Sequence, residues 1–300
     1  MRAAAYFAVV AALALWAGNW IVARAVRDDI SPGLITSARA LLVMLTLAPL
    51  AVPGLLGKLR RFAASDWAVL AALGVFGGGM HNAMQYLGLQ STTATNGTIF
   101  FSLSPVLIMV LAGMVLGERV RGAQWLGVAV SLAGVLMIAL RGEAEALAGL
   151  SFNPGDMLCL LSMLFWSAYT ICLRMQRAAL DPLQLLFMVC AIGLATMLPW
   201  LAWDLAYDPR AHFNLNGTLA LLYSAFASVI VAYAGWNYGV ARLGAARTGS
   251  FSHLLPAFGV IFAALFLKEY PAWYHFAGIA LIFGGIALSS VRASWASSNR

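Results

Sequence analysis

The residues best suited to bind a small molecule lie inside long apolar stretches and recur at helical spacing. Trp16, Asn19 and Trp20 stand at positions i, i+3 and i+4, which places all three on one face of a helix. His81 and Gln85 share a face in the same way further along the chain. An amide or imidazole deep in a bilayer must bond to a neighbouring helix or face a watered cavity. These groups therefore predict a polar cavity between helices.

Six apolar segments contribute candidates for the lining of this cavity. The candidate residues are Trp16, Asn19, Trp20, His81, Gln85, Tyr86, Phe101, Ser104, Trp166, Tyr169, Tyr233, Trp236, Asn237 and His253. His253 is the strongest individual candidate, because roughly ten residues of helix place it about 15 Å deep, near the midplane. For the tryptophans and tyrosines the alternatives are an interface belt or simple packing. Trp16 and Trp166 are expected on opposite sides of the cavity centre.

Arg39 is the one charged residue expected well inside an apolar segment. It lies about six residues from the start of the segment, so its long side chain could reach the lipid headgroups. The alternative is that its guanidinium contacts a substrate carboxylate. The sequence leaves both interpretations open.

The chain shows no pattern typical of catalysis or metal binding. Cys159, Cys172 and Cys190 lie in apolar segments and have no metal-ligand spacing. There is no His-Glu-x-x-His motif and no Gly-x-Ser-Gly-like site, and adjacency on a helix does not aim Ser252 at His253. We expect no catalytic residue, no metal and no cofactor, which disfavours an intramembrane enzyme. The lack of a charged ring disfavours a channel or sensor.

The composition places the chain among all-α integral membrane proteins. Of its 300 residues 62% are apolar and 10% charged, with a mean hydropathy of +0.86. The net charge of +7 comes from basic residues at the ends of apolar runs, so we expect lipid and no nucleic acid as a partner. Ten segments approach the roughly 20 residues that cross a bilayer. They are 4–23, 33–52, 66–89, 94–117, 122–140, 154–173, 183–203, 217–240, 243–267 and 271–291.

The two halves of the chain are related in sequence. Residues 15–24, which include Trp16 and Arg24, return as residues 165–174 at an offset of 150. Further along the offset becomes 151, as in Glu118 and Glu269. We therefore divide the chain into a first five-helix repeat, 1–150, and a second, 151–300. Because five spans are an odd number, the second repeat must be inverted relative to the first, as in many transporters.

The basic residues predict the orientation in the membrane. With a cytoplasmic N-terminus, 12 of the 18 Lys and Arg residues fall on the inside and five on the outside. The excess of positive charge on cytoplasmic segments favours both termini in the cytoplasm.

Prolines and glycines indicate bends and close packing. Pro105 and Pro256 are expected near the middle of the fourth and ninth spans, where each would remove a backbone hydrogen bond and bend the helix. Spaced glycines predict seams between helices or between subunits, which leaves a homodimer open. The glycine pairs are Gly74 with Gly78, Gly113 with Gly117, Gly127 with Gly134, and Gly278 with Gly285.

Together these features resemble the EamA family of the drug/metabolite transporter superfamily. The resemblance rests on the tandem halves, on Trp and Arg in the first and sixth spans, and on the glycine-rich fifth and tenth spans. It also rests on the proline-containing fourth and ninth spans, which end in Gly117-Glu118-Arg119 and Lys268-Glu269-Tyr270. The resemblance implies a ten-helix exporter of a bacterial inner membrane that works by alternating access. Its cavity would be lined by the first, third, fourth, sixth, eighth and ninth helices.

Within that family the aromatic lining is similar to that of aromatic amino-acid exporters. The substrate would then be an amino acid with an apolar or aromatic side chain. Sister groups on the same scaffold export threonine and homoserine, cysteine metabolites, purines or drugs, and these remain alternatives. No Asp or Glu is expected in the middle of a span, so only His81 and His253 could titrate there. We therefore expect a facilitator that runs without proton coupling.

Overall fold

The computed structural model describes residues 2–26, 28–92, 100–147, 153–177, 180–208, 210–211, 214–266 and 271–290. Within these ranges the chain is helical, and the only extended pairing is one isolated antiparallel bridge between Ile30 and Ala211. The predicted segment at Lys268, Glu269 and Tyr270 and the predicted start of the fourth span lie outside the described residues.

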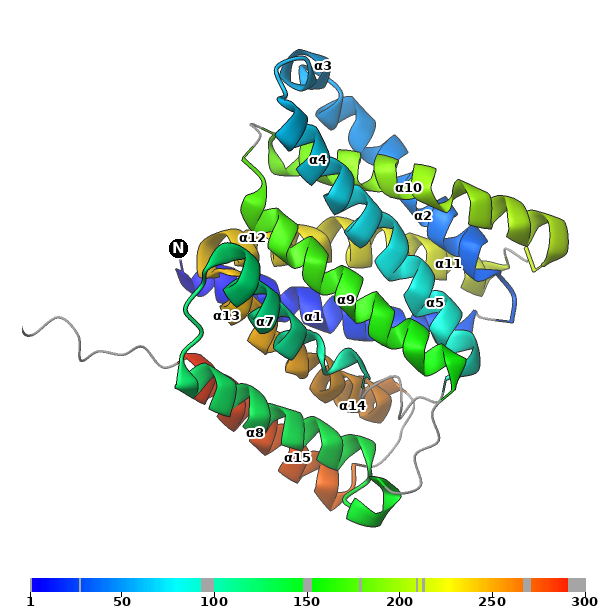
Figure 1. Cartoon of the computed structure of the whole chain (residues 1–300). Helices are drawn as coiled ribbons and strands as arrows, with labels where there is room; N and C mark the ends of the chain where they lie inside the picture. Colours follow the sequence, from blue (N-terminus) through cyan, green and yellow to red (C-terminus); the bar gives the residue numbers. More distant parts are fainter. Residues whose placement is uncertain are drawn as a thin grey trace, which may run out of the picture.

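The first half of the chain forms five membrane segments (Figure 1). They are α1 (Arg2–Ala25); α2 (Pro32–Ala51); α4 (Ala64–Leu73), which continues through η1 (Gly74–Met80) into α5 (His81–Ser91); α7 (Ser104–Leu116); and α8 (Gly122–Ala139). Short helices α3 (Leu55–Leu59) and η2 (Ala144–Leu147) lie in the connections.

The second half repeats this order. Its segments are α9 (Pro154–Met175); α10 (Pro182–Tyr207); α11 (Leu215–Leu222), η3 (Tyr223–Val231) and α12 (Ala232–Leu243) as one continuous stretch; α13 (Ala245–Ser250), η4 (Phe251–His253) and α14 (Leu254–Phe266); and α15 (Trp273–Ser290). Among the described residues six helices are long and apolar enough to cross a membrane, and α7 and α15 are shorter apolar helices. The prediction of an all-α membrane protein with ten spans in two inverted repeats is confirmed.

The packing of α8 against α15 displays the inversion directly. A Cβ added at Gly134 would lie 2.5 Å from the carbonyl oxygen of Gly278, and one added at Gly278 would lie 2.6 Å from that of Gly134. Gly127 and Gly285 approach each other in the same reciprocal way. Rising residue numbers on α8 meet falling numbers on α15, so these equivalent helices run antiparallel. The glycine seam lies within one chain, where Figure 1 shows the two helices side by side.

Equivalent contacts also join the two halves across the centre. Gly88 of α5 packs against Cys159 of α9, and Gly239 of α12 packs against Val9 of α1. Cys159 lies 150 residues after Val9, and Gly239 lies 151 residues after Gly88, so one contact is the repeat image of the other. Each half therefore places its third segment against the first segment of the other half.

The third and eighth segments both contain a π-helical stretch, η1 and η3. A π turn leaves backbone carbonyls without their usual helical partners. The Gly77 carbonyl accepts a hydrogen bond from the Tyr233 hydroxyl at 2.9 Å, and the Ser228 carbonyl accepts one from Trp16 Nε1 at 2.9 Å. Gly77 and Ser228 occupy the same repeat position, 151 residues apart. Aromatic side chains of the opposite half thus stabilise both irregular segments.

The fourth and ninth segments are broken before their prolines. Helical residues 100–101 are followed by a turn, and α7 then begins at Ser104, so the fourth segment is interrupted beside Pro105, which lies in the first turn of α7. In the ninth segment the 3₁₀ turn η4 precedes α14, and Pro256 lies in the first turn of α14. The missing proline N–H costs little at a helix start, because those donors have no helical partner.

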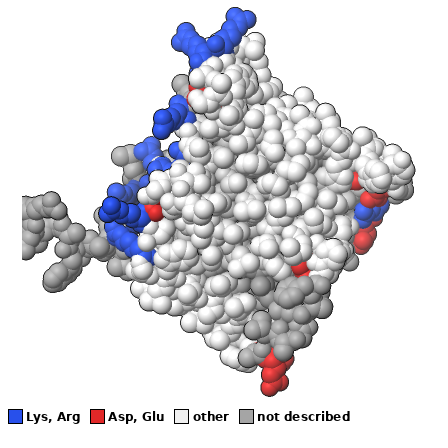
Figure 2. Space-filling view, in the orientation of Figure 1, with Lys and Arg blue, Asp and Glu red and all other residues white. Residues whose placement is uncertain are grey.

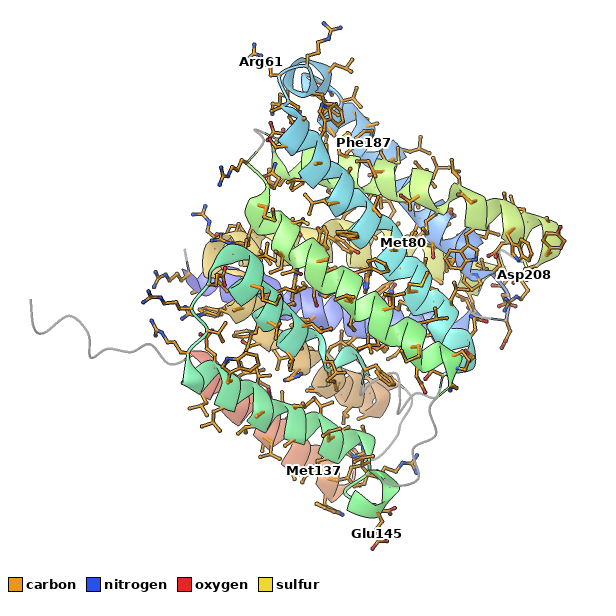
Figure 3. The ribbon with its side chains drawn as sticks, viewed as in Figure 1. Arg61, Met80, Met137, Glu145, Phe187 and Asp208 are labelled. Carbon is orange, nitrogen blue, oxygen red and sulfur yellow. The ribbon has the colours of Figure 1, made fainter. Side chains whose placement is uncertain are left out.

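On the face shown in Figure 2 the charges lie toward two opposite ends, with an uncharged band between them. Arg61 lies at one end, and Asp208 and Glu145 lie toward the other (Figure 3). Large apolar side chains such as Phe7, Leu45 and Phe276 are exposed on the molecule. Such a band fits the hydrocarbon layer of a bilayer.

Candidate functional site

The helices enclose a cavity of about 590 Å³. Nine of the 14 candidate residues line it. These are Trp16, Asn19, Trp20, His81, Gln85, Phe101, Ser104, Trp166 and Tyr233. Arg39 and Pro256 also line it. The sequence therefore located much of the wall, whereas the binding role of these residues stays a prediction.

Five candidates lie away from the cavity wall. Trp236 and Tyr169 are fully buried behind it, where Trp236 Nε1 donates to Thr170 Oγ1 at 3.3 Å. The Tyr169 hydroxyl donates to Asn237 Oδ1 at 2.8 Å, so Asn237 is engaged by a neighbouring helix. Tyr86 is buried beneath the guanidinium of Arg39.

His253, the strongest candidate from sequence, is the fifth of these residues and is fully buried. Its Nδ1 lies 2.5 Å from Ser131 Oγ, and its Nε2 lies 2.8 Å from the carbonyl oxygen of Ser102. A carbonyl can only accept, so Nε2 carries a proton and donates to Ser102. His253 thus connects the turn that precedes α7 with helix α8. We expected His253 in the cavity wall, but the structure buries it between these helices instead.

Most of the aromatic candidates form one cluster at the cavity, made of Trp16, Trp166, Tyr169, Tyr233 and Trp236. The rings of Trp16 and Trp166 meet edge to face with centroids 5.0 Å apart, so they do not flank the cavity centre as expected. Tyr233 and Trp236 contact both rings, with centroid separations of 5.2 to 5.7 Å. Trp20 and Phe101 pair separately at 4.0 Å. Such edge-to-face contacts favour a fixed geometry.

Beyond this cluster an ion pair joins the two halves. Arg174, in the last turn of α9, lies 3.7 Å from Glu118, which follows α7. The same carboxylate accepts a bond from the backbone N–H of Ala246 in α13 at 3.4 Å. The carboxylate of Glu118 therefore ties three segments together at the end of the bundle away from the cavity.

Arg39 is turned inward and lines the cavity, so it does not reach the lipid headgroups, and its contact with a substrate carboxylate stays a prediction. Its side chain is buried, with 4% of its surface exposed. Nη1 donates to Ser224 Oγ at 3.3 Å, and Nη2 donates to Asn82 Oδ1. The guanidinium lies over the ring of Tyr86, 5.5 Å from its centroid.

His81 is held by Ser162. The Ser162 hydroxyl donates to the backbone carbonyl of His81 at 2.8 Å, so its single proton is used there. His81 Nδ1 lies 2.9 Å from that hydroxyl oxygen and 3.2 Å from the Ser162 carbonyl, which requires Nδ1 to donate. In the neutral ring Nε2 is then an acceptor.

The sequence interpretation missed part of the wall. Asn82 and Ser228 lie in two of the six segments that were predicted to line the cavity. Both are polar residues inside an apolar run, which could have identified them as lining residues. Arg141, Tyr274 and other residues at the ends of α8 and α15 were missed because those helices carried only a packing prediction. Among the described residues no group of three His, Cys, Asp or Glu side chains is placed to hold a metal ion.

Two inverted helical halves around a cavity lined by aromatic and polar side chains define an integral membrane transporter. The chain belongs to the EamA-like transporter family, which matches residues 3–140 and 153–291 and is part of the drug/metabolite transporter superfamily.

Several relatives align over nearly the whole chain. An uncharacterized transporter of Archaeoglobus fulgidus is 26% identical over 97% of this chain and 99% of its own length. A probable terminal-alkyne amino-acid exporter of Streptantibioticus cattleyicolor is 26% identical over 96% of this chain and 94% of its own. An uncharacterized protein of Pseudomonas aeruginosa is 31% identical over 93% of this chain and 92% of its own length. One solved structure shares the fold, with a TM-score of 0.75, 21% identity and 97% of each chain covered.

Proposed function

We propose that this transporter exports amino acids with apolar or aromatic side chains across a bacterial inner membrane by alternating access. The observation that carries the proposal is the cavity of about 590 Å³. Trp16, Trp166 and Tyr233 form an apolar wall next to Asn19 and His81. Pockets of this size and mixed lining suit small organic molecules. The similarity to a probable terminal-alkyne amino-acid exporter supports the same substrate class.

The charge distribution supports an orientation for this transport. Lys and Arg gather at the end that carries Arg61, which the positive-inside rule assigns to the cytoplasm (Figures 2 and 3). Helix α8 begins beside Arg121 and runs away from that end, and the cavity reaches Arg141, just beyond the far end of α8. On this orientation both termini lie in the cytoplasm. The cavity faces outward, with the aromatic cluster and the Glu118–Arg174 pair closing the inner side.

Efflux from proteoliposomes tests the proposed function. Vesicles containing the purified chain are loaded with radiolabelled phenylalanine, and unlabelled leucine, threonine, cysteine and hypoxanthine are compared as competitors. We expect phenylalanine efflux above that of empty vesicles, with leucine competing better than threonine or hypoxanthine. Stronger competition by hypoxanthine or threonine than by leucine, or no phenylalanine efflux above that of empty vesicles, would contradict the proposal.

A pair of tryptophan variants controls for general effects on the protein. Trp166→Ala removes a ring from the cavity wall, whereas Trp203→Ala removes a ring that is 63% exposed on the outer surface. We expect only the first variant to lose efflux. Equal losses in both would show that the cavity is not the route.

A further inference from the structure

The charged groups among the described residues of the cavity lining are of one sign. This part of the lining includes Arg39 and Arg141 but no Asp or Glu. Of the 11 acidic residues in the chain only Glu269 lies outside the described residues. None of the described carboxylates forms an ion pair with Arg39. The cavity therefore presents a cation without a described counter-ion.

The guanidinium of Arg39 is held in place by neutral groups. Asn82 Nδ2 donates to the carbonyls of Gly77 and Gly78, at 2.9 and 3.2 Å, in the π-helical segment η1. These two bonds fix Asn82 so that its Oδ1 accepts from Arg39. Ser224 accepts a second bond from the guanidinium. A guanidinium has five N–H donors, and neutral acceptors do not offset a buried charge.

For a positive charge on the substrate the cavity offers only neutral partners. The Oδ1 atom of Asn19 is buried, is without a hydrogen-bond partner, and belongs to a residue of the lining. It can accept from an ammonium group or equally from a hydroxyl group. The aromatic faces can attract a cation, but such contacts are weaker than a charge-assisted bidentate bond to a carboxylate.

We propose that the carboxylate, bound by Arg39, is the group that this cavity requires, and that the α-amino group is dispensable. The substrate class is then aromatic or apolar carboxylic acids, with or without an amino group, and amines and esters are excluded. This inference rests on the proposed transport function and narrows its chemistry. The π-helical carbonyls of η1 act on the substrate indirectly, because they position Asn82 and through it Arg39.

A set of phenylalanine analogues tests the inference on the unmodified protein. Unlabelled phenylalanine, 3-phenylpropionate, phenethylamine and phenylalanine methyl ester compete with radiolabelled phenylalanine for efflux, and each is also tested for thermal stabilisation of the purified protein. We expect 3-phenylpropionate, which lacks only the amine, to act within about threefold of phenylalanine. We expect the amine and the ester to act at least about tenfold more weakly, because they leave the guanidinium unpaired.

Arginine variants test whether the preference for a carboxylate comes from one side chain, that of Arg39. Arg39→Gln should abolish the preference for 3-phenylpropionate over phenethylamine, and Arg39→Lys should keep the preference with weaker binding, since lysine retains the charge without the planar fork. Arg242→Gln is the matched control, because Arg242 lies over Tyr238 at the same 5.5 Å distance but is exposed outside the cavity. It should behave as the parent protein does.

The outcomes separate this inference from the proposed function. Thermal stabilisation by 3-phenylpropionate but not by phenethylamine, without any phenylalanine efflux, would refute amino-acid export and support the carboxylate requirement. Phenethylamine acting as strongly as phenylalanine, or no stabilisation by either acid, would overturn the inference. A preference that survives in Arg39→Gln would also overturn the role of Arg39.

Discussion

Replacing Gly285 by alanine would place a methyl group inside the contact between α15 and α8. The added Cβ would lie 2.6 Å from the backbone nitrogen of Ser131 and closer still to the carbonyl oxygen of Gly127, although real Cβ atoms essentially never come within 3.0 Å. The obstructing atoms are backbone atoms and cannot rotate away, so the two helices must separate. Overpacking of this kind costs about 1–3 kcal/mol.

The neighbouring residue provides the control. A Cβ added at Gly284 meets nothing within 4 Å, because this glycine lies on the exposed face of the same helix. Gly284→Ala and Gly285→Ala change the helix propensity by the same amount. In exposed positions this change favours alanine by roughly 0.5–1 kcal/mol. The difference between the two variants therefore isolates the contact with α8.

Thermal unfolding in detergent measures the difference. With the half-buried Cys172 replaced by serine, the buried thiols of Cys159 and Cys190 react with a thiol-specific fluorescent dye only as the protein opens, so the dye reports unfolding. We expect Gly285→Ala to lower Tm by several degrees, at about 2–4 °C per kcal/mol, and Gly284→Ala to leave Tm unchanged or slightly raised. Equal Tm values for both variants would refute the conclusion that this seam limits the approach of the helices.

Four further predictions concern transport. Trp166→Ala should lower efflux about tenfold or more while the protein stays folded, and unchanged efflux would show that the ring only packs. Glu118→Gln or Arg174→Gln removes an ion pair worth no more than about 1 kcal/mol, so we expect up to roughly fivefold more opening of the inner side. Faster labelling of Ser104→Cys in the cavity from that side, with the native cysteines removed, would measure this opening. On a cysteine-free background, a cysteine at Arg61 should react with an impermeant reagent only from the cytoplasm, and one at Glu145 only from outside; the reverse pattern would invert the proposed topology. Efflux should persist without an ion gradient, and uphill accumulation driven by a pH gradient alone would disprove a facilitator.

The number and order of helices followed from the sequence because a bilayer imposes a simple rule on length and polarity. Helix caps can be predicted from the local sequence only in part. Asn153 and Asp181 accept bonds from backbone N–H groups at the starts of α9 and α10, as a polar residue before proline predicts. At the start of α2 Ser31 makes no such bond, and Asp204 of α10 accepts from Gly33 N–H at 2.7 Å instead. A partner from a distant helix leaves no local pattern.

The cavity was harder to predict because helical spacing identifies a face but not what that face meets. Trp16 and Trp236 lie in similar patterns, yet one lines the cavity and the other is buried behind it. Irregular turns add a second difficulty. The 3₁₀ turn η4 carries His253, whose ring is directed toward Ser131, and the π-helical segment η1 ends two residues before Asn82. A regular 3.6-residue period does not predict directions within or beyond such turns.

The glycine seam between α8 and α15 also has a consequence for biosynthesis. Helix α15, Trp273–Ser290, is made roughly 130 residues after α8, Gly122–Ala139, which at ordinary translation speeds is on the order of ten seconds. During that interval the glycine face of α8 meets lipid or a temporary partner, although its final partner must approach to backbone contact. The first half therefore cannot complete its own packing before the second half is inserted.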